Sequence, residues 1–114
     1  MIGTKNRFRG QNDIKRIYRN GSIVRGDVIE LRYVDGNRQN SYRATVVVSK
    51  KVSKSAVVRN RIRRRVYEAI RQLSEQIQSN PDLLFTVHKE ELAGMPYPQV
   101  LLLTGNLLKK AKLL

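Results

Sequence analysis

Residues 49–71, SKKVSKSAVVRNRIRRRVYEAIR, constrain this chain more than any other stretch. If the segment is helical, apolar residues recur at spacings of three and four and form one continuous stripe: Val58, Ile62, Val66, Ile70, Leu73 and Ile77. Five arginines lie off that stripe: Arg59, Arg61, Arg63, Arg64 and Arg65. The pattern predicts a helix that is anchored by its apolar side and densely basic on its outer side.

The arginine cluster indicates an anionic partner. Like charges three or four positions apart on a helix each cost roughly 0.2–0.5 kcal/mol, and only Glu68 is close enough to compensate locally. A solvated surface face normally mixes both signs of charge. Because the planar guanidinium group matches phosphate oxygens in a bidentate way, we interpret this face as a surface for RNA or DNA backbone.

The overall composition supports this interpretation. A formal net charge of +14 on 114 residues implies a polyanionic partner and salt-sensitive binding. The length fits a single domain over residues 1–114, and the absence of cysteine excludes disulfides and thiolate chemistry. There is no apolar run of the roughly 18 residues that a membrane span needs, and no secretory signal segment. We therefore expect a soluble, cytoplasmic protein that does not engage membranes.

The N-terminal part of the chain predicts a flexible basic arm, residues 1–11, followed by a short helix. Asn12 or Asp13 could cap this helix, and Gly21 would end it. The apolar face of the helix comprises Ile14, Ile17 and Tyr18. Tyr18 is flanked by arginines, so it is either a core residue or a stacking platform for a nucleic-acid base.

Four further segments are rich in β-branched or apolar residues and predict strands, at residues 22–24, 27–34, 41–49 and 83–89. The Asp35-Gly36 pair predicts a turn, so the first three strands suggest an antiparallel meander.

Two longer helices complete the prediction. Ser53 or Ser55 would cap the basic helix, residues 56–78, and Pro81 would follow its end. A last, leucine-rich helix would begin near Pro98, which suits a first helical turn.

The side chains needed for catalysis are missing. A protein nuclease needs carboxylates that hold metal ions, or a nucleophile with a general base. The nine acidic residues are scattered, and the adjacent Glu90 and Glu91 would point to opposite faces of a strand. His88 is the only histidine, and no phosphate-cradling glycine loop is present. We therefore predict no catalytic residue in this chain.

Residues 48–71 closely resemble the signature of the bacterial ribonuclease P protein family: a valine-rich strand, Ser-Lys-Lys, a short loop and Arg-Asn-Arg on a long helix. The order of elements matches this family over nearly the whole chain. The resemblance implies an α+β fold, a two-layer α/β sandwich with a four-stranded, mostly antiparallel sheet and about three helices, similar to a ribosomal protein domain. It also implies a left-handed βαβ crossover, which is too rare to be derived from general rules.

The resemblance further implies a subunit that binds a catalytic RNA and the 5′ leader of precursor tRNA, while the RNA cuts the leader with Mg²⁺ that is held mainly by the RNA. The implied catalytic-RNA contacts are Lys51, Arg59, Asn60, Arg61, Arg63, Arg64 and Arg65. The implied leader contacts are Ile14, Tyr18, Arg32, Tyr33, Lys50 and Lys89.

The chain departs from the family pattern at several of these positions. Ile14 replaces a common phenylalanine, and the aromatic position of the first long strand falls on Arg32 or Tyr33. Tyr67 stands where an arginine is common, and Arg65 where a leucine is common. Two alternatives remain: a small basic ribosomal protein, and a DNA-binding helix-turn-helix module. The second is disfavoured because a strand, and not a short helix, precedes the basic helix.

Overall fold

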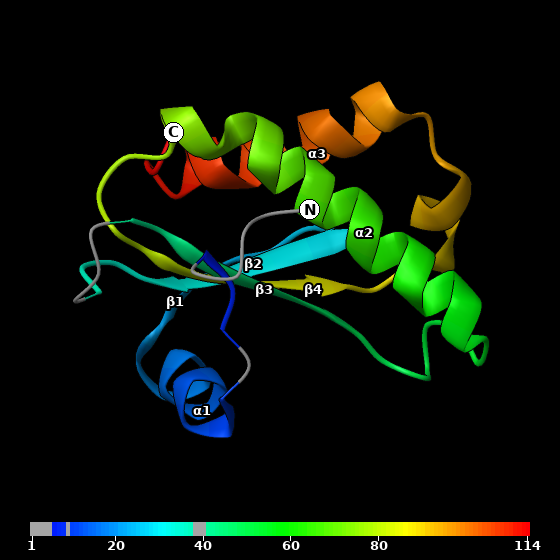
Figure 1. The fold of residues 1–114 in the computed structure, drawn as a ribbon, viewed down its shortest axis with the longest axis horizontal. Helices are drawn as coiled ribbons and strands as arrows, with labels where there is room; N and C mark the ends of the chain where they lie inside the picture. Colours follow the sequence, from blue (N-terminus) through cyan, green and yellow to red (C-terminus); the bar gives the residue numbers. More distant parts are fainter. Residues whose placement is uncertain (1–5, 9, 38–40) are drawn as a thin grey trace.

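A mixed four-stranded sheet lies between helices on its two faces (Figure 1), in a computed structural model that describes residues 6–8, 10–37 and 41–114. The strands are β1 (Ser22–Val24), β2 (Ile29–Val34), β3 (Arg43–Val48) and β4 (Asp82–Val87). The helices are α1 (Gln11–Asn20), α2 (Ala56–Leu73) and α3 (Tyr97–Lys110), with short 3₁₀ turns η2 (Ser74–Gln76) and η3 (Glu90–Gly94). Helices α2 and α3 cover one face and α1 covers part of the other, which confirms the predicted α+β sandwich.

The strand order is β1-β2-β4-β3, so the last strand of the sequence lies inside the sheet. Phe85 of β4 pairs antiparallel with Leu31 of β2 and parallel with Val46 of β3. The parallel pair is connected through α2, which makes the βαβ crossover. The antiparallel meander was therefore wrong for β2 and β3, which are not neighbours. Strand β4 is apolar and almost entirely buried, so it takes the inner position that is covered on both faces.

The apolar stripe of α2 anchors it to the sheet, as predicted. Ile62, Val66 and Ile70 are fully buried in the main core, between the sheet and helices α2 and α3. A second, smaller cluster lies on the opposite face of the sheet, where Ile17 of α1 packs with Phe8 and Leu84.

The helix boundaries correct two predictions. Helix α1 begins at Gln11 after Gly10, with no side-chain cap, so the prediction of a cap at Asn12 or Asp13 was wrong. Helix α2 is capped by Ser55, whose Oγ accepts a hydrogen bond from the backbone N–H of Val58 at 3.3 Å. It ends at Leu73, earlier than predicted, because the Ser74 hydroxyl donates to the Arg71 carbonyl and the chain tightens into η2.

Part of the expected N-terminal arm packs against the sheet. Residues 6–8 lie against β3, since the Asn6 amide donates to the carbonyl of Tyr42 at 2.8 Å and Phe8 is 4% exposed. Residues 1–5 and 9 of the expected arm lie outside the described residues. Gly21 ends α1 as predicted, and it is required there because a Cβ would lie 2.4 Å from the Ile17 carbonyl oxygen.

Candidate nucleic-acid interface

The outer face of α2 carries the arginine cluster. Arg61 and Arg64 are exposed on the side of the helix that faces away from the buried stripe. Arg59 donates from Nη1 to the carbonyl of Ser53 at 2.9 Å, which ties the helix to the preceding loop. Within the described part of the chain, no carboxylate lies at ion-pair distance from Arg59, Arg61, Arg63, Arg64 or Arg65. The guanidinium groups are therefore not neutralised by acidic neighbours.

Arg65 differs from the rest of the cluster. Its guanidinium group donates to the carbonyl oxygen of Met95, between η3 and α3. The only acidic residue of α2, Glu68, accepts hydrogen bonds at 3.0 Å from Nε of Arg71. These hydrogen bonds lower the pKa of the Glu68 carboxyl to about 2. Glu68 thus compensates Arg71 at the end of the helix and not the central arginines.

A second basic surface lies between α1 and the open part of the sheet. Tyr18 of α1 is 47% exposed, and the Arg32 guanidinium carbon lies 4.7 Å from the centre of its ring. Ile14 is half-buried against the smaller core cluster. Tyr33 points to the other face of the sheet and packs against the main core. The structure therefore brings together Ile14, Tyr18 and Arg32 but not Tyr33.

Glu30 supports this surface, and sequence analysis did not identify it. Its side chain is 12% exposed, and its carboxylate lies 3.5 Å from Arg32 Nε and 3.5 Å from His88 Nε2. Glu30 therefore orients Arg32 beside Tyr18, and it gives His88 a charged neighbour. The available signal was the period of two along β2, which places Glu30 and Arg32 on the same face.

Asp82, also missed, holds α1 against the sheet. Its carboxylate is fully buried and accepts hydrogen bonds from Arg43 at 2.8 and 2.7 Å, from Asn37 at 3.0 Å, and from Arg16 of α1. Burial raises the pKa of this carboxyl, but the hydrogen bonds from Arg43, Arg16 and Asn37 outweigh burial and hold the pKa below its usual value. The network connects α1 with β3 and β4, and so it positions Tyr18.

The predicted lysines lie at one edge of the sheet. Strands β3 and β4 are parallel and end together at the pair Val48 and Val87. Lys50 and Lys89 follow these two ends, and both are exposed. Lys51 is exposed beside Lys50, in the loop that leads to α2. Lys50 and Lys51 therefore lie next to the start of the α2 surface, because α2 begins after the same loop.

Comparison with known proteins identifies the family. The family model described as Ribonuclease P matches residues 2–112. The chain belongs to the ribonuclease P protein family. It is 35% identical to the ribonuclease P protein component of a Pseudanabaena species, over 100% of this chain and 97% of that protein. It is 37% identical to the corresponding protein of Clostridium kluyveri, over 94% of this chain and 95% of that protein.

Solved structures agree with this assignment. The ribonuclease P protein of Staphylococcus aureus has a TM-score of 0.83 at 25% identity and covers 95% of this chain and 96% of its own. That of Thermotoga maritima has a TM-score of 0.81 at 25% identity, with 91% and 96% covered. The chain is a protein subunit of ribonuclease P, with an RNA partner in the ribonucleoprotein, as the sequence predicted. Nothing in these comparisons favours a ribosomal protein.

Among the described helices, none is both long and apolar enough to cross a membrane. Within the same residues, no three histidine, cysteine, aspartate or glutamate side chains gather in a way that could hold a metal ion.

Proposed function

We propose that the chain binds the catalytic RNA of ribonuclease P through the outer face of α2 and binds the 5′ leader of precursor tRNA between α1 and the sheet. In this way it assists the RNA-catalysed removal of the leader. One observation carries the first part of the proposal: Arg61 and Arg64 are exposed, and no carboxylate of the described chain neutralises them, on a helix whose opposite stripe is fully buried.

The α2 surface suits the backbone of a folded RNA. Because the helix is fixed by its core contacts, the arginines do not need to be ordered from a flexible segment when RNA binds. Arg63 is held by Asn60, whose side-chain oxygen accepts its hydrogen bond, and Arg59 is held by the loop. Lys51 extends the same positive surface at the start of the helix. Arg65 contributes mainly to the anchoring of η3 and α3.

The surface between α1 and the sheet suits a single strand. A base can stack on the exposed part of the Tyr18 ring, while Arg32 contributes charge beside it. Ile14 has no π face, so it offers an apolar contact only. Lys50 and Lys89 lie exposed beyond the sheet edge, where they can accompany phosphates of the leader. Tyr33 does not contribute to this surface, because its partly buried side chain packs against the main core on the other face of the sheet.

We assign the cleavage chemistry to the RNA. The described acidic side chains do not form a cluster that fits Mg²⁺. We propose that the RNA holds the Mg²⁺ ions of the assembled enzyme.

Reconstitution tests the proposal directly. Adding the purified chain to bacterial ribonuclease P RNA at low magnesium concentration should restore cleavage of a precursor tRNA, because the basic surfaces replace part of the missing counterion screening. Cleavage is measured by gel electrophoresis of end-labelled precursor. A basic ribosomal protein of similar size serves as the control for charge alone. Equal stimulation by the two proteins would contradict a specific role of this chain in cleavage. A lack of stimulation by this chain would contradict it as well.

Replacing Tyr18 by alanine tests the leader contact. We expect precursor tRNA to bind the reconstituted enzyme about 1–3 kcal/mol more weakly, because one stacked base is lost. Binding of mature tRNA should be nearly unchanged, since it lacks the leader. Tyr18→Phe keeps the ring and should bind precursor almost as well as the original chain. Equal losses for precursor and mature tRNA would remove Tyr18 from the leader contact.

A further inference from the structure

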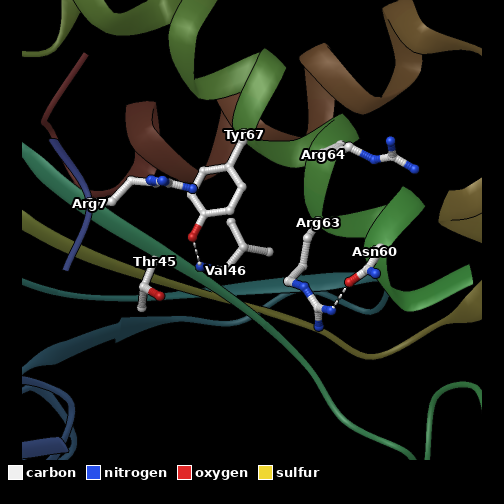
Figure 2. Close-up of a pocket in the computed structure, with 7 residues that line it drawn as sticks. All are labelled: Arg7, Thr45, Val46, Asn60, Arg63, Arg64 and Tyr67. Atoms are coloured by element: carbon white, nitrogen blue, oxygen red, sulfur yellow. Dashed lines mark hydrogen bonds between the residues drawn. The ribbon is translucent and has the colours of Figure 1, made fainter. Parts of the chain in front are cut away.

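A hollow of about 510 Å³ lies between the N-terminal segment, β3 and α2. Figure 2 shows the described residues that line it: Arg7, Thr45, Val46, Asn60, Arg63, Arg64 and Tyr67. Three of these residues are arginines and none is acidic. The hollow borders the edge of the sheet at β3, and it faces a different side of α2 from the one on which Arg65 contacts Met95.

The wall of the hollow is built around Tyr67. The backbone N–H of Val46 donates to the Tyr67 hydroxyl oxygen at 3.2 Å (Figure 2), so this side chain caps the edge of β3. Because the hydroxyl oxygen accepts this hydrogen bond, its own hydrogen stays available to donate. The Arg7 guanidinium carbon lies 5.9 Å from the centre of the Tyr67 ring, and the backbone of Arg7 bridges to Ala44 of β3. Arg7 is thereby fixed beside the basic helix.

One buried charged donor of the hollow lacks an acceptor within the described structure. Nε of Arg7 is buried and has no hydrogen-bond partner in the described structure. On the other side, the side-chain oxygen of the exposed Asn60 accepts a hydrogen bond from Arg63 (Figure 2), which holds the Arg63 guanidinium group at the rim of the hollow. A buried charged donor without an acceptor is unfavourable, and a bound anion would relieve this cost.

We propose that this hollow binds one internal phosphodiester of the RNA partner, with Arg7 and Arg63 as its main ligands and the Tyr67 hydroxyl as a further donor. The inference rests on the proposed function and extends the RNA surface from α2 across β3 to the N-terminal segment. The lining offers many donors and positive charges, which match phosphate oxygens. The volume exceeds that of a phosphate group, which leaves room for the flanking riboses.

The first test uses the free protein and inorganic phosphate. Phosphate that binds only the folded chain raises its melting temperature. We expect Arg7→Ala to lose at least about half of this rise, whereas Lys110→Ala, which removes the same charge from the exposed end of α3, should keep it. An equal rise in both variants would overturn the site. If Arg7→Ala fails to fold, Arg7→Lys replaces it, because lysine keeps the charge but loses the bidentate fork.

The second test uses the catalytic RNA. Arg7→Ala should bind it about tenfold more weakly and lower the salt slope of log K by about 1, as expected for one lost phosphate contact. Lys110→Ala should retain the original affinity and slope. Loss of phosphate binding without any loss of RNA affinity would mean that the site takes free phosphate, which overturns the assignment to RNA. If the original chain does not bind the RNA at all, the proposed function fails, whereas the phosphate test still decides whether the hollow is an anion site.

Discussion

Replacing Asp82 by alanine should lower the free energy of unfolding by about 3 kcal/mol, because it removes the acceptor that Arg43 and Arg16 share. The Arg43 side chain is only 17% exposed, so water cannot fully replace the lost carboxylate. The same substitution should loosen α1, since Arg16 links that helix to Asp82 of the inner strand β4. The measurement is denaturant unfolding followed by circular dichroism.

Asp13→Ala is the matched control. The Asp13 carboxylate also approaches Arg16 and Arg43, at 3.8 and 3.7 Å, but its side chain is 36% exposed. An exposed ion pair contributes less than about 1 kcal/mol. We therefore expect a much smaller loss for Asp13→Ala than for Asp82→Ala. Equal losses would show that the burial of Asp82 does not increase its contribution to the free energy of unfolding.

The same carboxylate makes stability depend on pH. The pKa of Asp82 is lower in the folded chain than its ordinary value of 3.8, so its contribution is complete above that value. The contribution is lost as the pH falls through the folded pKa, because protonation removes the charge that the arginines face. The original chain should therefore lose stability in acid more steeply than Asp82→Ala. Parallel acid curves for both chains would contradict this assignment.

Replacing Arg61 and Arg64 together by alanine should weaken binding to the catalytic RNA and lower the salt slope of log K by about 2, because two phosphate contacts are lost. Both side chains are exposed, and neither holds another part of the described structure. The free energy of unfolding should therefore change little. Affinity is measured at several salt concentrations, and an unchanged slope would remove these side chains from the RNA surface.

Arg65→Ala should affect mainly stability, in contrast to the double variant, which should affect mainly RNA binding. Its guanidinium group donates to the Met95 carbonyl, so its removal should lower the free energy of unfolding by about 1–2 kcal/mol. The salt slope should fall less than in the double variant. This contrast separates an arginine that supports the fold from the arginines that we assign to RNA, although all three lie within one turn or so of the same helix.

The sequence predicted the features that depend on local periodicity. The stripe of Ile62, Val66 and Ile70 gave the buried side of α2 and, by exclusion, its basic side. The cap at Ser55 and the stop at Gly21 also follow from local chemistry. The family and its fold class came from the resemblance of residues 48–71, which no physical rule replaces.

Long-range pairing could not be predicted in the same way. The insertion of β4 between β2 and β3 depends on burial over both faces of the sheet, whereas the Asp35-Gly36 turn signal favours pairing of β2 with β3. Asp82 joins Arg16, which lies 66 residues earlier, and no local pattern marks such a pair. The position of Arg7 beside α2 could not be predicted either, because only its contact with Tyr67 in the folded chain shows it.

The inner position of β4 has a consequence for the folding of the chain during its synthesis on the ribosome. Before residues 82–87 emerge, β2 and β3 have no common neighbour, so the sheet exists only as two separate parts. The arginine-rich segment is synthesised before β4, the strand that completes the sheet on which α2 packs. Folding must therefore wait until most of the chain is made, which is the expected cost of non-local contacts. Nascent chains that end before β4 would expose an unpacked basic segment that can bind RNA non-specifically.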